Sequence, residues 1–299
     1  MAGILELDRF SLENLTRWTQ LSSDLDELQA ILFFGLQPEQ RRLRPELIAA
    51  LHAEQRVEHR MQRWVRNVAY RYSLEPLSAA GSLHGYGGRF NPGNDLDAGT
   101  LRPFPALYIA QDVETAFREK FQLPSSAGID GLRPEELALT QIGSFLTLVV
   151  NGVLRNVFDM TSPRSLAGIA RILGRIKMPE RARRLQKKLG ISTRALSMVR
   201  TGPHLHAAAL HLNWRALPAQ FGLPAPSQVL AELIREASFD GILYSSTKGS
   251  GRCVAIFPDR LSADSYVELA DAAPPTATLT RLTQTNGHQL AGWDTLPVG

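Results

Sequence analysis

The first 65 residues carry a helical pattern of apolar and polar positions. Apolar residues recur over residues 10–65 at the spacing that places them on one face of a helix. Within this stretch, segments begin at Ser11, at Asp24 and at Pro45, where the first turn of a helix tolerates proline. Because these segments precede every candidate chemical motif, we predict that residues 1–65 form a separate N-terminal helical region.

Short apolar runs bounded by turn residues predict β-strands farther along the chain. One run covers residues 106–110, and Asp112 then begins a helix as its cap. A second run covers residues 145–154 and leads into a turn, and residues 157–161 predict the next strand. The remaining elements predicted by this pattern are a helix over 227–236 and strands over 239–246 and 252–257.

Two stretches depart from this alternation of short strands and helices. Residues 170–212 predict two or three basic helices. After Arg260 the periodicity weakens, and residues 272–278 are small and rich in proline. We therefore assign residues 261–299 to a C-terminal extension and expect a loose tail or a partner-facing arm from residue 272 onward.

A glycine-bracketed turn, Gly87–Gly93, has the sequence Gly-Gly-Arg-Phe-Asn-Pro-Gly. Glycine permits tight turns in which backbone N–H groups can face a ligand, and this turn also holds an arginine and an asparagine. Tyr108 and Glu119 follow at the ends of short elements, and the strand over 239–246 ends in two serines. Together these groups favour a phosphorylated, aromatic and positively charged ligand, a description that NAD meets.

The order of these motifs resembles the RES domain family, which is named for its arginine, glutamate and serine. The resemblance covers residues 66–260. It rests on Arg71 in Tyr-Arg-Tyr, the Gly87–Gly93 turn, Tyr108 with Glu119 eleven positions later, the run 239–246 and the strand 252–257. RES proteins are bacterial toxins with an ADP-ribosyltransferase-like fold, and they destroy NAD or modify a protein with it. They are usually paired with an Xre-type helix-turn-helix antitoxin protein.

The resemblance therefore implies an α+β fold. We expect an ADP-ribosyltransferase-like β core with surrounding helices over residues 66–260. Residues 170–212 then become a basic helical insertion within that domain, preceded by the N-terminal helical region. Within the family's pattern, Phe90 stands where tryptophan is usual.

Cleavage of the nicotinamide–ribose bond needs a grip on the pyrophosphate, an aromatic contact for nicotinamide and a negative charge near the ribose. Arginine binds phosphate through a planar, permanently charged fork, so Arg89 is the leading candidate and Arg71 the second. Tyr108 offers a flat ring with a polar hydroxyl. Glu119 is the expected carboxylate for the developing positive charge. Glu114 is the competing acid, although it lies on a different face of the predicted helix.

The family serine corresponds to Ser246 when positions are counted back from the strand over 252–257, and Ser245 then takes the usual proline position. The alternative assignment to Ser245 stays open. We expect this serine to orient the glutamate or to bond the ribose, since no histidine base lies near it in sequence. The expected catalytic residues are thus Glu119, Ser246 and Arg89. The expected NAD-binding residues are Arg71, Arg89, Tyr108, Asn91 and Ser245.

The composition argues against a bound cofactor and against a membrane-spanning segment. His204, His206 and His211 cluster, but no cysteine or carboxylate is interleaved with them, so we expect neither a metal site nor a prosthetic group. NAD is expected as the substrate. Cys253, the single cysteine, is expected to fill the core, and a reducing cytoplasm is the simplest compartment. No signal peptide is evident, and the apolar windows are too short to span a bilayer.

The net charge of +4 hides a strong asymmetry. Residues 171–215 contain eleven lysines or arginines and one acid, Glu180. Basic helices can bind phosphates nonspecifically, so a nucleic-acid-binding or partner-binding protein is an alternative from another class. No helix-turn-helix or aromatic platform is evident, so we expect contact with nucleic acid only through the antitoxin. The segment could instead receive an acidic antitoxin or cover the NAD pocket.

The leading hypothesis is an enzyme that consumes NAD by hydrolysis or phosphorolysis of the nicotinamide–ribose bond. Transfer of ADP-ribose to a protein acceptor is the alternative enzymatic outcome, because the same motifs serve both reactions.

Overall fold

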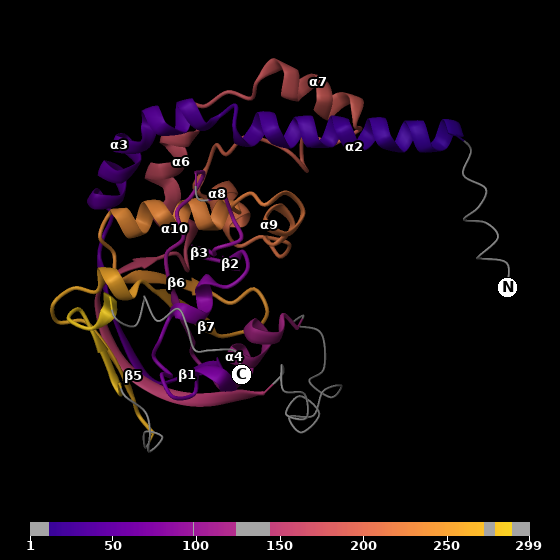
Figure 1. Cartoon of the computed structure of the whole chain (residues 1–299). Helices are drawn as coiled ribbons and strands as arrows, with labels where there is room; N and C mark the ends of the chain where they lie inside the picture. Colours follow the sequence, from indigo (N-terminus) through magenta and orange to yellow (C-terminus); the bar gives the residue numbers. More distant parts are fainter. Residues whose placement is uncertain (1–11, 98, 124–143, 272–278, 289–299) are drawn as a thin grey trace, which may run out of the picture.

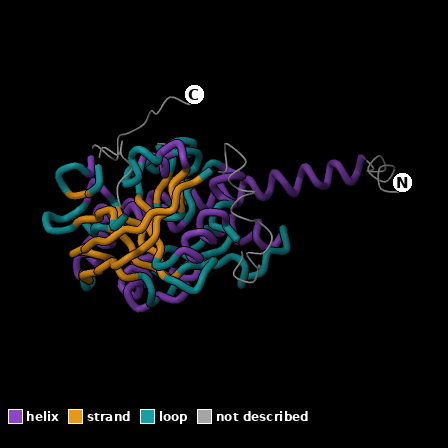
Figure 2. Tube along the Cα trace, turned by 90° about the horizontal axis from the view of Figure 1, so that it is seen from below, coloured by secondary structure: helices purple, strands orange, loops and turns teal. Residues whose placement is uncertain are grey.

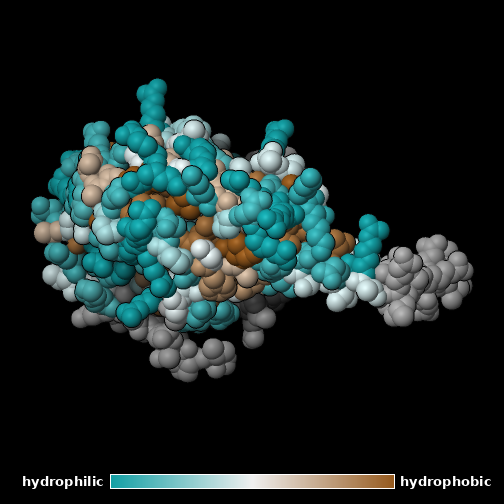
Figure 3. Space-filling view, turned by 90° about the horizontal axis from the view of Figure 1, so that it is seen from above, coloured by the Kyte–Doolittle hydropathy of each residue, from teal (hydrophilic) through white to brown (hydrophobic). Residues whose placement is uncertain are grey.

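The computed structural model describes residues 12–97, 99–123, 144–271 and 279–288. Most helices gather above a strongly curved sheet, and one long N-terminal helix lies across the top (Figure 1). Seen from below, the strands form the centre of the body and this helix projects beyond it (Figure 2). Seen from above, the opposite face carries hydrophobic patches between hydrophilic side chains (Figure 3). This α+β architecture confirms the predicted fold class.

A seven-stranded sheet in the order β1-β4-β7-β6-β5-β8-β9 forms the core. Its strands are β1 (Val57–Ala69), β4 (Leu107–Ala110), β5 (Phe145–Asp159), β6 (Gly241–Ser245), β7 (Arg252–Ile256), β8 (Tyr266–Leu269) and β9 (Arg281–Thr283). Neighbouring strands are antiparallel except β5 and β6, which are parallel. Because β1 also pairs with β5, the first five strands in this order close into a ring. A separate hairpin, β2 (Gly87–Gly88) with β3 (Asn91–Pro92), lies outside the sheet.

Most of the helices lie above this ring, and α4 (Val113–Phe121) lies below them beside β1 (Figure 1). The other α-helices of the described residues are α2 (Leu12–Phe33), α3 (Gln37–Ala53), α6 (Ala167–Leu173), α7 (Glu180–Lys188), α8 (Gly202–Ala209), α9 (Ala216–Phe221) and α10 (Pro226–Glu236). The predicted strand over 106–110, the helix capped by Asp112, the helix over 227–236 and the last two strands are therefore confirmed. In the parts of the chain that the structure describes, no helix is both long and apolar enough to cross a membrane.

The prediction of helix over residues 57–65 is wrong, because this stretch forms β1. Its arginines, glutamine and methionine are good helix formers, so local propensity pointed to a helix. Pairing with β5 along most of the strand overrides that propensity, and Met61, Trp64 and Val65 are buried in the result. Arg63 takes a φ of 53° where the register of this pairing shifts.

Residues 145–159 form one continuous strand, which corrects the prediction of two strands with a turn between them. Asn151 and Gly152 suggested that turn, but both pair with β8 inside β5. A Cβ on Gly152 would lie 2.5 Å from the carbonyl oxygen of Tyr266, so this glycine serves the close approach of two strands.

Parts of the N-terminal helical region and of the C-terminal extension pack into the core of the domain. Leu47 of α3 is buried in the same apolar cluster as Ile169 of α6 and Leu230 of α10, so this helix is not a separate unit. Leu282 of β9 is fully buried beside Val267 of β8, and the predicted loose tail therefore contributes a strand. Of that tail, residues 272–278 and 289–299 lie outside the described residues.

The insertion and α2 form an upper layer. Leu28 of α2 packs against Ala182 and Leu185 of α7 in a small apolar cluster. The helical character predicted for residues 170–212 is confirmed, since α7 and α8 lie within that stretch. The layer leaves part of α2 uncovered, and Trp18 there is 66% exposed.

Asp240 generates a prediction for stability. This fully buried carboxylate accepts hydrogen bonds from the Asn156 N–H (2.9 Å), the Ser262 N–H (2.7 Å) and the Ser265 hydroxyl (2.6 Å). Asp240→Ala leaves these donors without their partner and should lower the free energy of unfolding by about 2–4 kcal/mol, measured by urea denaturation. The control Asp264→Ala removes an exposed acid of the turn that contains Ser262 and Ser265. It should change the free energy of unfolding by less than about 0.5 kcal/mol. Equal losses in the two variants would contradict this role.

Candidate active site

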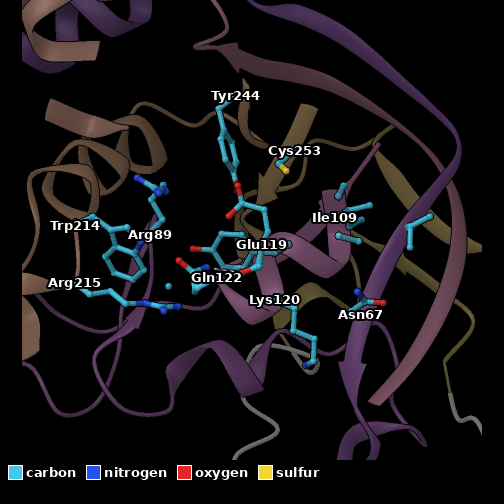
Figure 4. A pocket seen from close by; sticks show the side chains of 15 residues that line it. Asn67, Arg89, Ile109, Glu119, Lys120, Gln122, Trp214, Arg215, Tyr244 and Cys253 are labelled. Carbon is cyan, nitrogen blue, oxygen red and sulfur yellow. Dashed lines mark hydrogen bonds between the residues drawn. The ribbon is translucent and has the colours of Figure 1, made fainter. Parts of the chain in front are cut away.

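A cavity of about 240 Å³ lies where β1, β4, β6 and β7 approach α4. Three residues predicted from the sequence, Arg89, Tyr108 and Glu119, line it together. Figure 4 shows Glu119 at the centre of this group, with the side chain of Arg89 to one side. The sequence reasoning therefore collected residues that the fold brings into one place.

Glu119 is positioned by the local structure of α4. Asp112 caps this helix by accepting from the N–H of Thr115 at 2.7 Å and from its hydroxyl at 2.9 Å. The carboxylate of Glu119 accepts a hydrogen bond from the Ser246 hydroxyl at 2.6 Å and one from the Thr247 N–H at 3.2 Å. A glutamate held by two donors has a defined orientation, so α4 and the loop after β6 fix the charge in the cavity.

The two candidate serines have different places. Ser246 contacts Glu119, and its hydroxyl oxygen also accepts from the N–H groups of Lys248 (3.0 Å) and Gly249 (2.8 Å). Ser245 is exposed at the end of β6, opposite Arg252, and does not line the cavity. Successive residues of a strand face opposite sides, which is why only one of the two can reach the glutamate.

The competing acid, Glu114, lies outside the cavity. Its side chain is 57% exposed and pairs with Arg118 one turn along the helix at 2.9 Å. Among the described residues that line the cavity, Glu119 is the one carboxylate. Helical geometry thus separates the two glutamates, as the spacing predicted.

Arg89 is a buried cation, with 4% of its surface exposed. Its Nη1 donates to the carbonyl oxygens of His211 (2.9 Å) and Ala209 (3.4 Å), and its Nη2 donates to the Thr247 hydroxyl (2.8 Å). Its Nε has no hydrogen-bond partner in the described part of the chain, and no carboxylate there forms an ion pair with it. Burial lowers the pKa of the Arg89 guanidinium, but arginine keeps its charge in proteins. A buried guanidinium with a donor left over suits an anion.

The glycine turn holds Tyr108. The phenol of Tyr108 donates to Oδ1 of Asn91 at 2.8 Å and accepts from the Phe90 N–H at 2.9 Å. A Cβ on Gly88 would lie 2.4 Å from the same phenol oxygen, so only glycine fits there. Asn91 is fully buried, donates to the Ser82 carbonyl at 2.8 Å and does not line the cavity. The structure therefore places Asn91 behind the wall, where it positions Tyr108 instead of meeting a ligand.

Gln228 of α10 anchors the turn from the other side, and the sequence reasoning missed it. This fully buried side chain donates from Nε2 to the carbonyl oxygens of Tyr86 (2.8 Å), Gly88 (3.0 Å) and Asn91 (3.0 Å). A glutamine in an amphipathic helix carries no local signal for such a role. Its partners lie far away along the chain.

Three further lining residues were also missed. Trp214 and Arg215 follow the insertion, and Tyr244 lies two positions before Ser246 in β6. The guanidinium carbons of Arg89 and Arg215 lie 5.8 and 5.1 Å from the Trp214 ring centre, and Figure 4 shows the three side chains along one side of the cavity. The period of two along β6 would have found Tyr244, since it shares a face with Ser246.

Several donors around the cavity have no protein acceptor. Within the described residues, Nε of Arg89, Nε of Arg215 and Nδ2 of Asn67 are buried without a hydrogen-bond partner, and all three residues line the cavity. Burial also raises the pKa of the Tyr108 and Tyr244 phenols, so both stay protonated at neutral pH. The cavity is therefore rich in donors and suits a ligand with many acceptor oxygens.

Arg71 and Cys253 were also singled out from the sequence. Arg71 belongs to a short 3-10 helix, Tyr70–Tyr72, and its side chain lies outside the described residues. Cys253 is buried at the floor of the cavity, where burial raises the pKa of its thiol, so it packs as the predicted core residue.

His204, His206 and His211, which cluster in the sequence, were not expected to bind a metal. Nε2 of His206 lies 3.0 Å from the Met160 carbonyl oxygen, and Nδ1 of His211 accepts from the Asn213 N–H at 3.2 Å. Within the described ranges, no group of three or more metal-ligating side chains comes together.

The family model of the RES domain matches residues 60–281. The chain belongs to the RES domain family. The match extends beyond residues 66–260 in both directions, and it therefore takes in most of β1 and all of β8. The matched range includes the hydrogen-bonded pair Glu119 and Ser246.

No curated protein matches the sequence. A chain of the crystal structure of the M. tuberculosis MbcT–MbcA toxin–antitoxin complex aligns with this RES domain at a TM-score of 0.39 and 14% identity, over 82% of this chain and 96% of that chain.

The contact between Tyr108 and Asn91 generates a prediction for the wall of this RES domain. Tyr108→Phe and Asn91→Ala should each destabilise the fold, because each removes one partner of a buried hydrogen bond. In a double-mutant cycle by urea denaturation, the two changes should couple by about 1 kcal/mol. Tyr70→Phe, at a tyrosine that is 65% exposed, is the control and should show no coupling to Asn91→Ala. Additive losses for Tyr108 and Asn91 would mean that their contact contributes nothing.

Proposed function

We propose that this RES domain is a toxin enzyme that consumes NAD by cleaving the bond between nicotinamide and ribose, with water or phosphate as the acceptor. The observation that carries the proposal is the pairing, within one cavity, of a buried arginine without a carboxylate partner and an oriented glutamate. The first suits a pyrophosphate, and the second suits a sugar that becomes positively charged.

The pyrophosphate would bind between Arg89 and Arg215. Their Nε donors are buried without partners, and both guanidinium groups lie beside Trp214. Two guanidinium groups satisfy a dianion better than one, because each can donate along a different direction to phosphate oxygens. The fixed carbonyl contacts of Arg89 hold its fork in place before the ligand arrives.

The ribose would then lie beside Glu119. As the C1′–N bond breaks, its electron pair leaves on neutral nicotinamide, and the ribose becomes an oxocarbenium-like cation. The carboxylate stabilises this cation, and the hydrogen bond from Ser246 keeps it oriented without any motion during the reaction. An oxygen of water or phosphate then bonds to C1′, and water releases one proton.

The aromatic residues complete the site. Tyr108 and Tyr244 line the cavity as neutral phenols, so they can contact a ring without adding charge, while the hydroxyl of Tyr108 donates to Asn91. Family membership adds an expected partner, an Xre-type helix-turn-helix antitoxin, which would be the component that contacts nucleic acid.

The test is the release of nicotinamide from NAD by the purified chain after treatment with chelator. Glu119→Gln keeps the shape of the side chain and removes its charge, so it should lower kcat by roughly 100- to 1,000-fold and change KM little. Glu114→Gln, on the exposed face of the same helix, is the matched control and should keep full activity.

Product analysis separates the enzymatic outcomes. Free ADP-ribose indicates hydrolysis, ADP-ribose 1″-phosphate indicates phosphorolysis, and labelled protein indicates transfer. Intact NAD with no labelled protein at high enzyme concentration, or a well-folded Glu119→Gln variant with full activity, would overturn the proposal.

The arginine pair generates a second prediction from the same reaction. Arg215→Ala should raise KM for NAD by roughly 10- to 100-fold with a smaller effect on kcat, because a phosphate contact is present in both the ground state and the transition state. Arg89→Ala should raise KM at least as much and also lower kcat, since it shifts Thr247, which contacts Glu119. Arg194→Ala, at an exposed arginine of the insertion, is the control. An unchanged KM in Arg215→Ala would exclude that residue from the phosphate site.

A further inference from the structure

A second and larger cavity, of about 770 Å³, lies in the insertion. We call it the insertion groove. Its lining comprises Met178, Arg183, Gln186, Lys187, Ile191, Ser192, Thr193, Leu196, Ser197, Met198, Arg200 and His204. In Figure 1, α7 lies at the top of the molecule and α4, which carries Glu119, lies far below it. The groove is therefore separate from the proposed active site.

Hydrogen bonds hold the walls of the insertion groove in place. Gln186 of α7 donates from Nε2 to the carbonyl oxygens of Ser192 (3.3 Å) and Leu196 (2.8 Å), so the loop after α7 is tied to the helix. Arg200 donates to the carbonyl oxygen of Ile176 at 3.1 Å and also to that of Gly174. A groove whose walls are fixed in this way loses little conformational entropy when a partner binds.

The two sides of α7 use their charges differently. On the side facing the N-terminal helix, Arg181 pairs with Glu27 at 2.7 Å and Lys188 pairs with Asp24 at 2.6 Å. These ion pairs attach the insertion to α2. They account for part of the basic excess, and they leave the other side of the helix to be explained.

The groove side of α7 carries cations with little compensation. Arg183 lies 3.8 Å from Glu180, a long contact between two exposed groups. Lys187, one turn later on the same face, has no ion pair in the described part of the chain. Arg200 adds a third positive charge, and the described residues that line the groove include no aspartate or glutamate.

The floor of the insertion groove is apolar. Met178, Ile191, Leu196 and Met198 are only partly buried and lie among the cationic side chains. Methionine adapts to the shape of an apolar partner. Among the described residues that line the groove, none is Phe, Tyr or Trp, and His204 is the one ring that could stack on a base, so this surface suits nucleic acid less well than it suits a protein segment.

From this combination we propose that the insertion groove binds an acidic, amphipathic segment of a partner protein. The apolar side chains of the segment would cover the methionines, isoleucine and leucine, and its carboxylates would pair with Arg183, Lys187 and Arg200. The complementarity of charge fixes the orientation, and the apolar contacts exclude water. The proposal does not depend on the reaction at Glu119.

The test uses the full chain and a fluorescein-labelled helical peptide of leucine and glutamate, with binding followed by fluorescence anisotropy. Two comparison peptides replace glutamate by lysine, or leucine by glutamine. The leucine–glutamate peptide should bind at least about tenfold more tightly than either, because only it provides both kinds of contact. Equal binding of the three peptides would overturn the proposal.

Matched charge reversals locate the binding surface. Arg183→Glu with Lys187→Glu should weaken binding of the leucine–glutamate peptide by at least about tenfold. Arg171→Glu with Arg184→Glu makes the same change in net charge at exposed positions outside the groove and should weaken it less than about threefold. Both double variants should cleave NAD like the parent chain, which separates this result from that of the proposed function.

Two outcomes would overturn the location or the class of partner. Equal losses in the two double variants would mean that net charge, and not the groove, attracts the peptide. A duplex DNA of matched charge that binds more tightly than the peptide, and that loses affinity only in the groove variant, would identify a nucleic-acid surface instead.

Discussion

The pairing of β1 with β5 is the constraint on which the rest of the molecule depends. These two long strands run antiparallel over most of their length, and β1 reaches β4 with its other edge. The ring that results has no free edge between β1 and β5, and it bends both strands around the core. Because the ring is closed, the ends of β4, β6 and β7 face α4 across a single cavity. The glutamate, the serine and the tyrosines meet there.

The site also depends on a buried charge that forms no ion pair within the described residues. Arg89 is held by the carbonyl oxygens of Ala209, at the end of α8, and of His211, and by the hydroxyl of Thr247. Those partners fix its position, and the charge of Glu119 acts on it across the cavity. The insertion supplies the carbonyl oxygens, and the residues just after it supply Trp214 and Arg215. A segment that departs from the rest of the domain in composition thus becomes part of the candidate active site.

The structure shows different roles for different basic residues of the insertion. Some cations join α7 to α2, and Arg175 pairs with Glu46 of α3. Arg215, just after the insertion, lines the cavity beside Glu119, and Arg183, Lys187 and Arg200 line the insertion groove. The basic residues of this region therefore include some that attach α7 to α2, one that lines the candidate site and some that line an exposed groove. Only the fold shows which residue has which place.

Local sequence patterns were sufficient to predict much of the secondary structure and several residues of the candidate site. The strand β4, the cap at Asp112, the helix α10 and the strand β7 follow from the periodicity and turn chemistry of their own residues. Glu119 was separable from Glu114 by helical spacing alone, and the order of the motifs sufficed to collect Arg89, Tyr108 and the pair Ser245 and Ser246.

Interactions between distant residues decided the rest. The residues of β1 favour a helix until β5 pairs with them, and Gly152 marks a turn until β8 approaches it. The choice of Ser246 over Ser245 required the face of β6 that meets α4. Gln228, Trp214 and Arg215 carry no signal of their own, because each acts on a group far away in the chain. The sequence by itself determined most of the elements and the candidate residues, because both follow from local patterns, and the tertiary structure decided which polar groups found partners and which were left without them.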